Sequence, residues 1–429
     1  MKRYRNPQKE TWAEICQRPV MGTANLNELV NKVLENVRSN GDQALREYSL
    51  RFDGLDLQEF QVSQTEISAA IQTVSNELKE AIQLAKGNIE RFHKKQQEVI
   101  QKIETTPGVV CWRESRGIEK VGLYIPGGTA PLFSTVLMLG VPAQLAGCGE
   151  IVLCTPPDKN GSVDPAILFT ADLVGITKIF KVGGAQAIAA MAYGTESIPQ
   201  VYKIFGPGNQ YVTKAKELVQ QVGTAIDMPA GPSEVLVIAD ETCEPSFVAA
   251  DLLSQAEHGT DSQVILLSTS EEVIDQVMME LSAQVEQLPR KEIAVQALEK
   301  SRAVSLETME QCFEMSNAYA PEHLILASEN ADRYLGLIRN AGSVFIGNYS
   351  CESAGDYASG TNHTLPTNGY ARNYSGVSLD SFVRKITFQK LSSEGIQNIG
   401  PAIECMAEAE QLFAHKNAVT LRLNSLKND

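Results

Sequence analysis

The sequence lacks the features that mark several large classes of protein. Its eight cysteines are scattered, and no two are spaced as Cys-x-x-Cys. This argues against a thiolate zinc site or a disulfide framework and favours free thiols in a reducing cytoplasm. The N-terminal ten residues are polar, so no secretory signal is expected. No apolar run reaches the roughly 18 residues of a membrane helix, and we expect a cytoplasmic protein.

Positive charge is also scarce. The chain has 37 Lys and Arg residues against 52 Asp and Glu residues, a formal net charge of −15. It contains no block of five or more basic residues, so nucleic acid is not an expected partner, and an anionic membrane surface would repel it. A cofactor with a pyrophosphate would therefore have to be held by backbone N–H groups and a few local cations.

Histidine is rare, but its placement is informative. The 429 residues include five histidines, and four of them lie in the second half of the chain near acids or amides. These four are His258, His323, His363 and His415, whereas His93 lies elsewhere. Imidazole is the commonest metal ligand and the side chain that titrates nearest neutral pH. The pattern predicts a metal site together with an acid/base pair.

Apolar segments alternate with turns in a way that indicates the fold class. We expect a helical lead-in over the first 25 residues and amphipathic helices over 26–49 and 67–95. From about residue 121, strand-length apolar runs alternate with turns and helical segments up to 239, and again from 247 to 346. This alternation is typical of parallel sheets covered by helices. The predicted class is α/β, with two Rossmann-like parallel-sheet domains, incomplete and duplicated, plus small helical N- and C-terminal segments.

The last part of the chain has a different texture. Residues 350–375 are rich in Gly, Ser, Asn and Tyr, and a loop of this length in a compact domain is often functional. A helical tail is expected from about 400 to 414. The segment 416–423 is apolar enough for a final strand or a docking piece.

Two segments carry candidate metal ligands. Gln255 and His258 are spaced i, i+3 near a helix end, which places both on one face. Asp356 and His363 bracket a loop of Gly, Ser, Thr and Asn, and a carboxylate with an imidazole suits zinc. The alternatives are solvated polar residues at a helix end and a polar surface loop.

Two further histidines have an acid nearby. Glu322 and His323 precede an apolar strand candidate, and one could activate water while the other takes a substrate proton. The alternative is a capping Glu beside a half-buried His. His415 follows Glu410 by five residues at a helix end, where it is either a metal ligand or a cation that stabilises the helix.

Three glycine-containing turns lie at 124–128, 183–186 and 206–209. The last two follow strand candidates and open helices, the setting in which backbone amides hold phosphate. The GxGxxG fingerprint is absent, because Tyr211 stands where its third Gly would be. Tight turns alone would explain the glycines, but not Gln186 and Asn209 at corresponding helix starts.

Eight segments of the sequence carry a resemblance to a known family. They are GLYIPGG at 122–128, GGAQA at 183–187, FGPGN at 205–209, DMPAGPSE at 227–234, SQAEHG at 254–259, PEHL at 321–324, AGDYASGTNH at 354–363 and AHKNAVTLR at 414–422. Together they resemble the histidinol dehydrogenase family. They run in order across nearly the whole chain, and several are long and specific. The chain does not depart from the family at a position that should carry chemistry.

The resemblance implies a zinc-dependent, NAD-linked four-electron oxidation of L-histidinol to L-histidine, the last step of histidine biosynthesis. The reaction would pass through L-histidinaldehyde, use one Zn²⁺ per subunit and consume two NAD⁺. By resemblance, the metal ligands are Gln255, His258, Asp356 and His415, and the catalytic acid/base pair is Glu322 and His323. The implied substrate contacts are Ser233, Gln255, His258, His323, Asp356, His363, Glu410 and His415. The implied NAD⁺ contacts are Tyr124, Gln186 and Asn209.

The resemblance also implies a homodimer with shared active sites, to which His415 comes from the partner subunit. The implied domains are an N-terminal helical segment at 1–23, a first Rossmann-like domain at 24–123 and 235–377, a second, NAD-binding one at 124–234, and a dimerisation segment at 378–429. The first domain would carry most of the metal and acid/base residues.

Other functions remain as alternatives at this point. A zinc hydrolase also uses a Glu that activates water beside a metal, but it needs no dinucleotide turns. A metal-binding or scaffold protein leaves the Glu-His pair and the glycine turns without purpose. A thiol-based aldehyde dehydrogenase would need a cysteine in a nucleophile setting, and none is recognisable in the sequence.

Overall fold

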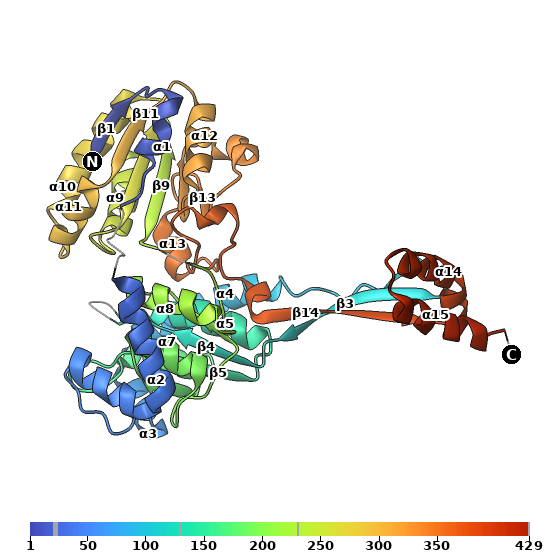
Figure 1. Ribbon diagram of the computed structural model, residues 1–429. Coiled ribbons are helices and arrows are strands. Elements are labelled where there is room, and N and C mark those ends of the chain that lie inside the picture. The colour runs from blue at the N-terminus through green and yellow to red at the C-terminus, as the bar shows by residue number, and fades with distance from the viewer. Residues whose placement is uncertain (20–24, 128–130, 230, 428–429) are drawn as a thin grey trace. The chain divides into compact units, whose positions relative to one another are not determined.

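The computed structural model describes residues 1–19, 25–127, 131–229 and 231–427 (Figure 1). Gly128 and Ala230, which belong to two of the motifs above, lie outside these ranges. The chain forms two compact units. Unit 1 comprises Met1–Gln96 and Ile118–Phe382, and unit 2 comprises Gln97–Gly117 and Val383–Asp429. Among the described residues, no helix is long and apolar enough to cross a membrane.

Unit 1 contains a five-stranded parallel sheet with the order β6-β5-β4-β7-β8. Its strands are β4 (Lys120–Tyr124), β5 (Glu150–Thr155), β6 (Lys178–Lys181), β7 (Lys203–Phe205) and β8 (Ala225–Ile226). The chain enters at the centre, winds outward through β5 and β6, and then returns to β7 on the other side of β4. The strand order therefore reverses between β4 and β7, as in doubly wound folds.

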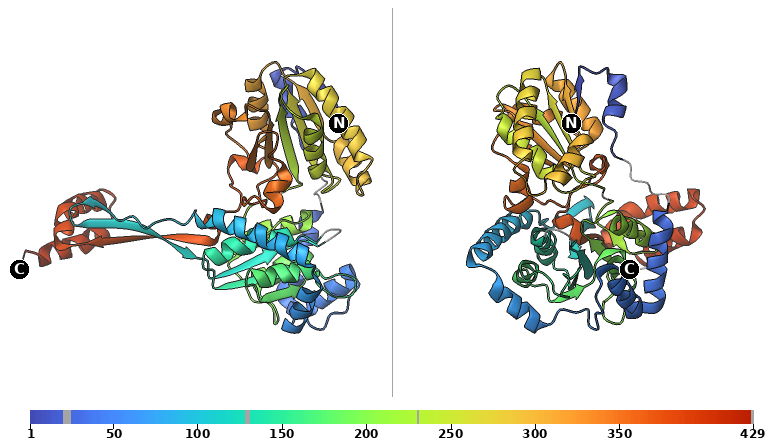
Figure 2. Two further views of the ribbon diagram at one scale, coloured as in Figure 1. Left: turned by 180° about the vertical axis from the view of Figure 1, so that it is seen from behind. Right: turned by 90° about the vertical axis from the view of Figure 1, so that its left-hand side faces the viewer.

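Helices cover both faces of this sheet (Figures 1 and 2). They are α2 (Leu26–Tyr48), α3 (Gln64–Thr73), α4 (Asn76–Lys94), α5 (Phe133–Leu145), α6 (Pro165–Leu173), α7 (Gly184–Tyr193) and α8 (Gln210–Gln220). Successive strand residues point to opposite faces. Leu153 packs in the core with α4, α5 and α6, whereas its neighbour Cys154 packs with α2, α7 and α8.

The packing of α2, α3 and α4 differs from the expected grouping. Residues 24–123 were expected to form one domain with 235–377. These three helices instead contact α7, α6 and α5 of the five-stranded sheet, because their apolar faces complete its two cores. The packing favours placing them with the five-stranded sheet, and the domain limits themselves remain a proposal.

A second parallel sheet in unit 1 has six strands in the order β1-β11-β10-β9-β12-β13. They are β1 (Lys2–Arg5), β9 (Glu234–Ala239), β10 (Gln263–Ser268), β11 (Arg302–Ser305), β12 (His323–Ala327) and β13 (Ser343–Ile346). From β9 the winding repeats that of the first sheet, and it reverses between β9 and β12. The two α/β arrangements confirm the predicted fold class.

Helices flank this sheet too. The α-helices here are α1 (Trp12–Ile15), α9 (Pro245–Ala256), α10 (Glu271–Val285), α11 (Lys291–Glu299), α12 (Met309–Tyr319) and α13 (Glu352–Tyr357). Five short segments of unit 1 are η1 (Lys9–Thr11), the π-helix η2 (Ser49–Asp53), η3 (Ala331–Leu337), η4 (Tyr370–Arg372) and η5 (Leu379–Phe382). Val237 packs with α9 and α10, and its neighbour Ile238 packs with α1 and α12.

The expected helical lead-in is wrong for the first residues. Lys2–Arg5 is the edge strand β1, which pairs in parallel with β11, and the helix α1 follows only at Trp12. A four-residue strand of mostly basic residues has no apolar pattern of its own, so its pairing with β11 determines its conformation.

Unit 2 is an antiparallel sheet with two helices. Its strands are β2 (Ile103–Thr106), β3 (Val109–Gly117) and β14 (Val383–Leu391), in the order β14-β3-β2. The helix α14 (Ser393–Ala409) packs on α15 (Phe413–Ser425) at one end of the long β3–β14 ribbon (Figure 2). The apolar segment 416–423 is thus helical, which excludes the final strand considered above.

Candidate functional site

The predicted acid/base residues meet at the amino end of the six-stranded sheet. Strand β12 begins at His323, which is paired with Val235 of β9, so Glu322 and His323 lie beside Glu234 and Val235. The Glu234 N–H donates to Glu322 Oε2 at 3.0 Å, and the Glu234 carbonyl lies 3.3 Å from His323 Nδ1. The main chain of Glu234 thus holds both side chains.

Glu322 and His323 do not point apart as residues of an extended strand would. His323 Nδ1 lies 3.7 Å from Glu322 Oε2. Glu322 precedes the first residue of β12, and its carboxylate turns back toward the Glu234 N–H. Both side chains are buried, so the pair can exchange protons with a substrate inside a cavity.

The predicted ligand Gln255 lies on α9 and is buried. In the orientation that satisfies both ends of its amide, its nitrogen donates to Glu352 Oε1 at 2.7 Å and its oxygen accepts from the Glu234 N–H at 3.1 Å. Gln255 therefore links the acid/base pair to the first residue of α13.

Three donor groups lie close enough to hold one metal ion. They belong to His258, which follows α9, and to Glu352 and Asp356 of α13, and their candidate ligand atoms lie within 4.8 Å of one another. Among the described residues, three buried polar atoms of this region have no hydrogen-bond partner: His323 Nε2, Glu352 Oε2 and Asp356 Oδ1. An imidazole with carboxylate oxygens is a donor set that fits zinc.

The structure places one acid that was not predicted, Glu352, beside the predicted ligands His258 and Asp356. Glu352 precedes Asp356 by four residues on α13, and this i, i+4 spacing is the signal that could have revealed it. Asp356 was expected at the start of a loop, but it lies within the short helix. The helix is what places both carboxylates on the side facing His258.

His363 is fixed on both sides of its ring. Its Nδ1 lies 2.9 Å from the carbonyl oxygen of Asp356, and its Nε2 lies 3.1 Å from Thr135 Oγ1 on α5. Burial lowers the pKa of His363, which favours the neutral ring. Because Nδ1 donates to a carbonyl oxygen, Nε2 of the neutral ring is an acceptor, which a substrate donor could reach in place of the Thr135 hydroxyl.

The carboxylates and histidines of the site shift one another's pKa. Burial raises the pKa of Glu322 to about 8. For His323, burial lowers the pKa, but attraction to Glu352, Glu322 and Asp356 outweighs it and raises the pKa to about 10. Burial would raise the pKa of Asp356, yet His323 holds it below its usual range. Such coupled, buried groups are typical of a functional site.

These residues share one cavity of about 640 Å³, a size suited to a small-molecule ligand. Of the predicted site residues, the cavity is lined by Asn209, Ser233, Gln255, His258, Glu322, His323, Asp356 and His363. The turn at Gly206, at the carboxyl end of β7, lines the same cavity. The cavity therefore joins the amino end of one parallel sheet to the carboxyl end of the other.

Of the three predicted cofactor contacts, one lines the cavity and two do not. Asn209 is the N-cap of α8, and its side chain accepts from the N–H groups of Tyr211 and Val212 at 3.0 and 3.1 Å. Tyr124 at the end of β4 and Gln186 in α7 are both buried and are not among the residues that line the cavity. Gly184 N–H donates to the Tyr124 hydroxyl at 3.1 Å, so Tyr124 supports the second glycine turn.

The two remaining predicted residues belong to unit 2. Glu410 is the C-cap of α14, and His415 lies in the first turn of α15. Their roles as substrate and metal contacts remain predictions.

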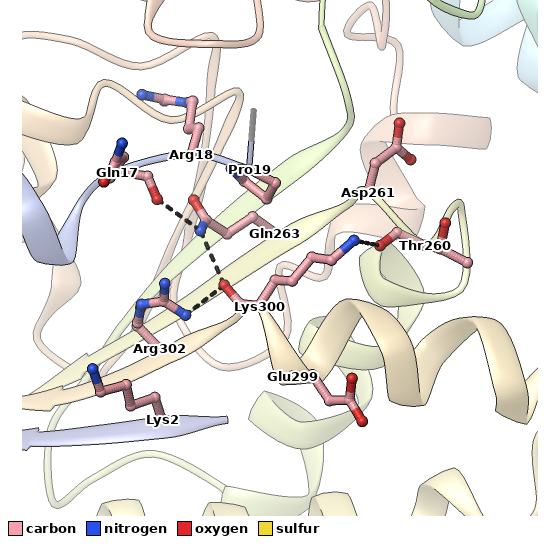
Figure 3. Close-up of a pocket in the computed structure, with 10 residues that line it drawn as sticks. All are labelled: Lys2, Gln17, Arg18, Pro19, Thr260, Asp261, Gln263, Glu299, Lys300 and Arg302. Carbon is pink, nitrogen blue, oxygen red and sulfur yellow. Dashed lines mark hydrogen bonds between the residues drawn. The ribbon is translucent and has the colours of Figure 1, made fainter. Parts of the chain in front are cut away.

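A second hollow of about 510 Å³ lies at the amino end of the strands β1, β10 and β11 (Figure 3). Gln263 Nε2 donates to the carbonyls of Gln17 and Lys300, at 3.2 and 3.0 Å, and Arg302 donates to the same Lys300 carbonyl at 2.7 Å (Figure 3). Lys300 Nζ donates to the carbonyl of Thr260 at 2.8 Å. These contacts join the N-terminal residues to the sheet, and no predicted site residue lines this hollow.

Arg18 lines both hollows. Its guanidinium donates to both carboxylate oxygens of Glu234 and lies over the ring of Tyr319, 3.9 Å from the centroid. This ion pair fixes the side chain of Glu234, and the main chain of Glu234 in turn holds Glu322 and His323. No residue pattern in the sequence connects Arg18 with Glu234, which is 216 residues away.

Comparison with known proteins gives one consistent family. The family model described as histidinol dehydrogenase matches residues 16–423. A histidinol dehydrogenase of Bacteroides thetaiotaomicron is 61% identical over 427 residues and covers 100% of both chains. One of Xanthomonas euvesicatoria is 55% identical over 408 residues, 95% of each chain.

Solved structures agree with these relatives. The crystal structure of histidinol dehydrogenase from Elizabethkingia anophelis is 63% identical, covers 100% of this chain and 99% of that one, and superposes with a TM-score of 0.98. An acetylating aldehyde dehydrogenase from Geobacillus thermoglucosidasius is 15% identical with a TM-score of 0.50. The second likeness concerns the fold alone.

Proposed function

The chain belongs to the histidinol dehydrogenase family of histidine-biosynthetic oxidoreductases, and from this premise we propose that it oxidises L-histidinol to L-histidine in two NAD⁺-linked steps at a zinc site. The observation that carries the proposal is the convergence of Glu322 and His323 with His258 and Asp356 in one cavity. L-Histidinaldehyde would be the intermediate that stays bound between the steps. The cytoplasm is the proposed location.

The residues of this chain that would hold zinc are Gln255, His258 and Asp356, with His415 of a partner subunit. When bound, zinc would hold the amine and imidazole of the substrate, and NAD⁺ would accept the hydride. Glu352 supports this set because it accepts a hydrogen bond from Gln255 and lies within reach of His258 and Asp356. Such outer partners orient metal ligands in many proteins.

In the first step, His323 takes the proton of the substrate hydroxyl. Its Nδ1 is directed to the carbonyl oxygen of Glu234, which leaves Nε2, 3.5 Å from Asp356 Oδ1, as the basic atom. Two of the carboxylates that raise the pKa of His323, those of Glu352 and Asp356, also face the proposed metal position. Neutralising their charge lowers this pKa and makes the neutral, basic form available.

In the second step, Glu322 takes a proton from water as the water adds to the aldehyde carbon. His323, which took a proton in the first step, returns it to the carbonyl oxygen, so the product is the gem-diol. His323 then removes a hydroxyl proton from the gem-diol as the second hydride leaves. Burial raises the pKa of Glu322, and a carboxylate with a raised pKa is a stronger base than one in water. The hydrogen bond from the Glu234 N–H keeps its carboxylate oriented.

The cofactor would bind at the glycine turns of the five-stranded sheet, where Asn209 and Gly206 line the cavity. The incomplete phosphate fingerprint suits a weak site, because NADH must leave between the steps while the aldehyde stays. Free aldehyde released into solution during a single turnover would count against this scheme.

A homodimer with shared active sites is part of the proposal. Glu410 would contact substrate in the same shared site to which the partner's His415 contributes. The proposed homodimer is supported by large apolar side chains that are exposed on α14, on α15 and on the link between them. They are Met406, Leu412, Phe413 and Leu421. Exposed apolar groups of this kind mark interaction surfaces.

The first test is the stoichiometry of NADH. The purified protein is incubated with L-histidinol and excess NAD⁺, with and without prior chelation. We expect two NADH per histidinol, lost on chelation and restored by zinc. One NADH would indicate an alcohol dehydrogenase that releases aldehyde, and none with any metal would favour a hydrolase.

A further inference from the structure

A buried ion pair lies under the turn that follows β7. Lys216 of α8 and Asp227, which follows β8, approach to 2.5 Å, and their side chains are only 4% and 1% exposed. Few charged side chains are so completely buried, because removing them from water is costly. The burial of this ion pair therefore needs a structural or functional explanation.

Both partners bind the same residue of the turn. Lys216 Nζ donates to the Gly206 carbonyl at 2.8 Å, and Asp227 Oδ2 accepts from the Gly206 N–H at 2.8 Å. Asp227 Oδ1 also accepts from the N–H of Met228 at 2.7 Å. The last paired residue of β7 is Phe205. Beyond this end of the strand, the ion pair provides the hydrogen-bond partners for the N–H and carbonyl of Gly206.

Gly206 packs closely against the end of β4. Its φ is +126°, and a Cβ at this position would lie 2.1 Å from the carbonyl oxygen of Tyr124. Lys216, Asp227 and Gly206 all line the cavity of about 640 Å³, as does Asn209 three residues after Gly206. The ion pair thus determines where the turn presents its backbone to the cavity.

We propose that Lys216 and Asp227 are positioning residues that hold the turn at 206–209 in the geometry that receives NAD⁺. An apolar pair of similar volume could fill this space with comparable stability, but it could not bind both the N–H and the carbonyl of Gly206. The inference rests on the proposed function, since it assumes that this turn receives the cofactor. The pair touches none of the predicted metal or acid/base residues, so it acts on cofactor binding and not on the chemistry.

The test compares four variants of the zinc-loaded enzyme: Lys216→Met, Asp227→Asn, the double variant and Lys216→Arg. NAD⁺ affinity is measured by calorimetric titration, and KM and kcat are measured for both substrates. We expect Lys216→Met and Asp227→Asn to weaken NAD⁺ binding about tenfold or more, with a much smaller change in kcat and in KM for L-histidinol. Lys216→Arg should recover part of the affinity, because it keeps a donor and the charge.

The double variant removes both charges together, so it remains informative if a single variant does not fold. It should bind NAD⁺ as weakly as the single variants although no unpaired charge is left.

Asp42→Asn is the matched control. Asp42 is also a buried acid, and it lies beside the same sheet but away from the turn. Its carboxylate accepts hydrogen bonds from Ser197. We expect its NAD⁺ affinity to equal that of the unaltered enzyme. Unchanged affinity in the double variant, or an equal loss in the control, would overturn the inference and leave the proposed function standing. If the unaltered protein binds no NAD⁺, the proposed function fails and the inference fails with it.

Discussion

The two parallel sheets of unit 1 share a winding order but carry their candidate site residues at opposite ends. In the five-stranded sheet, the turns at Gly183 and Gly206 follow the carboxyl ends of β6 and β7. In the six-stranded sheet, Glu234, Glu322 and His323 lie at the amino ends of β9 and β12. Ligands of open α/β sheets usually bind outside the carboxyl ends, where the strand order reverses. The six-stranded sheet departs from this rule.

The reason lies at the carboxyl ends of β9 and β12. Asp240 accepts hydrogen bonds from the N–H and hydroxyl of Thr242, at 2.9 and 2.6 Å, and from the Ser328 hydroxyl at 2.5 Å. Thr242 in turn accepts from the N–H of Glu329 at 2.8 Å. Polar side chains of the protein therefore occupy the place that a ligand would take in the other sheet. Equal topology does not imply an equal functional end.

The largest expected effect is at the amino end of the six-stranded sheet. His258→Asn should lose zinc and activity together, because it removes one of the clustered metal donors. We expect activity to fall more than about 100-fold, since even outer partners of metal ligands contribute 10–100-fold. Metal content and kcat are measured on the same preparation. Full activity without bound metal would refute the role of His258 as a ligand.

Glu322→Gln separates the two steps at this same end. Oxidation of L-histidinaldehyde should fall by about 10²–10⁴-fold, the usual contribution of a general base, while oxidation of L-histidinol should fall much less. Each half is followed by NADH formation from its own substrate. An equal loss in both halves would remove Glu322 from water activation.

Gly206→Ala probes the carboxyl end of the five-stranded sheet. A Cβ there would lie 2.1 Å from the Tyr124 carbonyl, so the turn must shift, and we expect KM for NAD⁺ to rise about 10–100-fold. Gly223→Ala is the control, because Gly223 also has a positive φ, +110°, but nothing within 4 Å of the added Cβ. An equal rise in both variants would assign the effect to backbone strain.

Asp240→Asn should have the smallest effect on catalysis. It weakens the polar network at the carboxyl end of the six-stranded sheet, and we expect a loss of about 1–3 kcal/mol in the free energy of unfolding. The midpoint of thermal unfolding should fall, with KM and kcat unchanged. A raised KM for NAD⁺ or L-histidinol would show that this end also binds a ligand.

Much of the fold is readable from the sequence for a physical reason. The strands β9 and β12 are buried on both faces, so they stand out as apolar runs at 235–239 and 323–327. Ser63 caps α3 and forms a capping box with Glu66, a spacing that the sequence shows directly. By contrast, β14 is mostly exposed or half-buried, and it is a strand because it pairs with β3, which no local pattern reveals.

In the candidate site, too, some features can be read from the sequence and others depend on the tertiary fold. Motifs indicated which residue types belong together, and the structure places His258, Asp356, Glu322 and His323 around one cavity. Glu352 is connected with the site in the sequence only by its i, i+4 spacing from Asp356, which has this meaning only when the segment is helical. Contacts between distant segments, such as Lys216 with Asp227 through Gly206, depend on the tertiary fold.

The divided unit 2 fixes an order of events during synthesis. Strand β3 leaves the ribosome before residues 118–382 are made, and its partner β14 follows them. At roughly 5–20 residues per second, this interval lasts tens of seconds. The strands of the five-stranded sheet all lie between the start of Lys120–Tyr124 and the end of Ala225–Ile226. That sheet can therefore form before β14 is made. During this interval β3 presents an unpaired edge of the kind that recruits foreign strands, and the nascent chain is most exposed to misassembly just before its last helices appear.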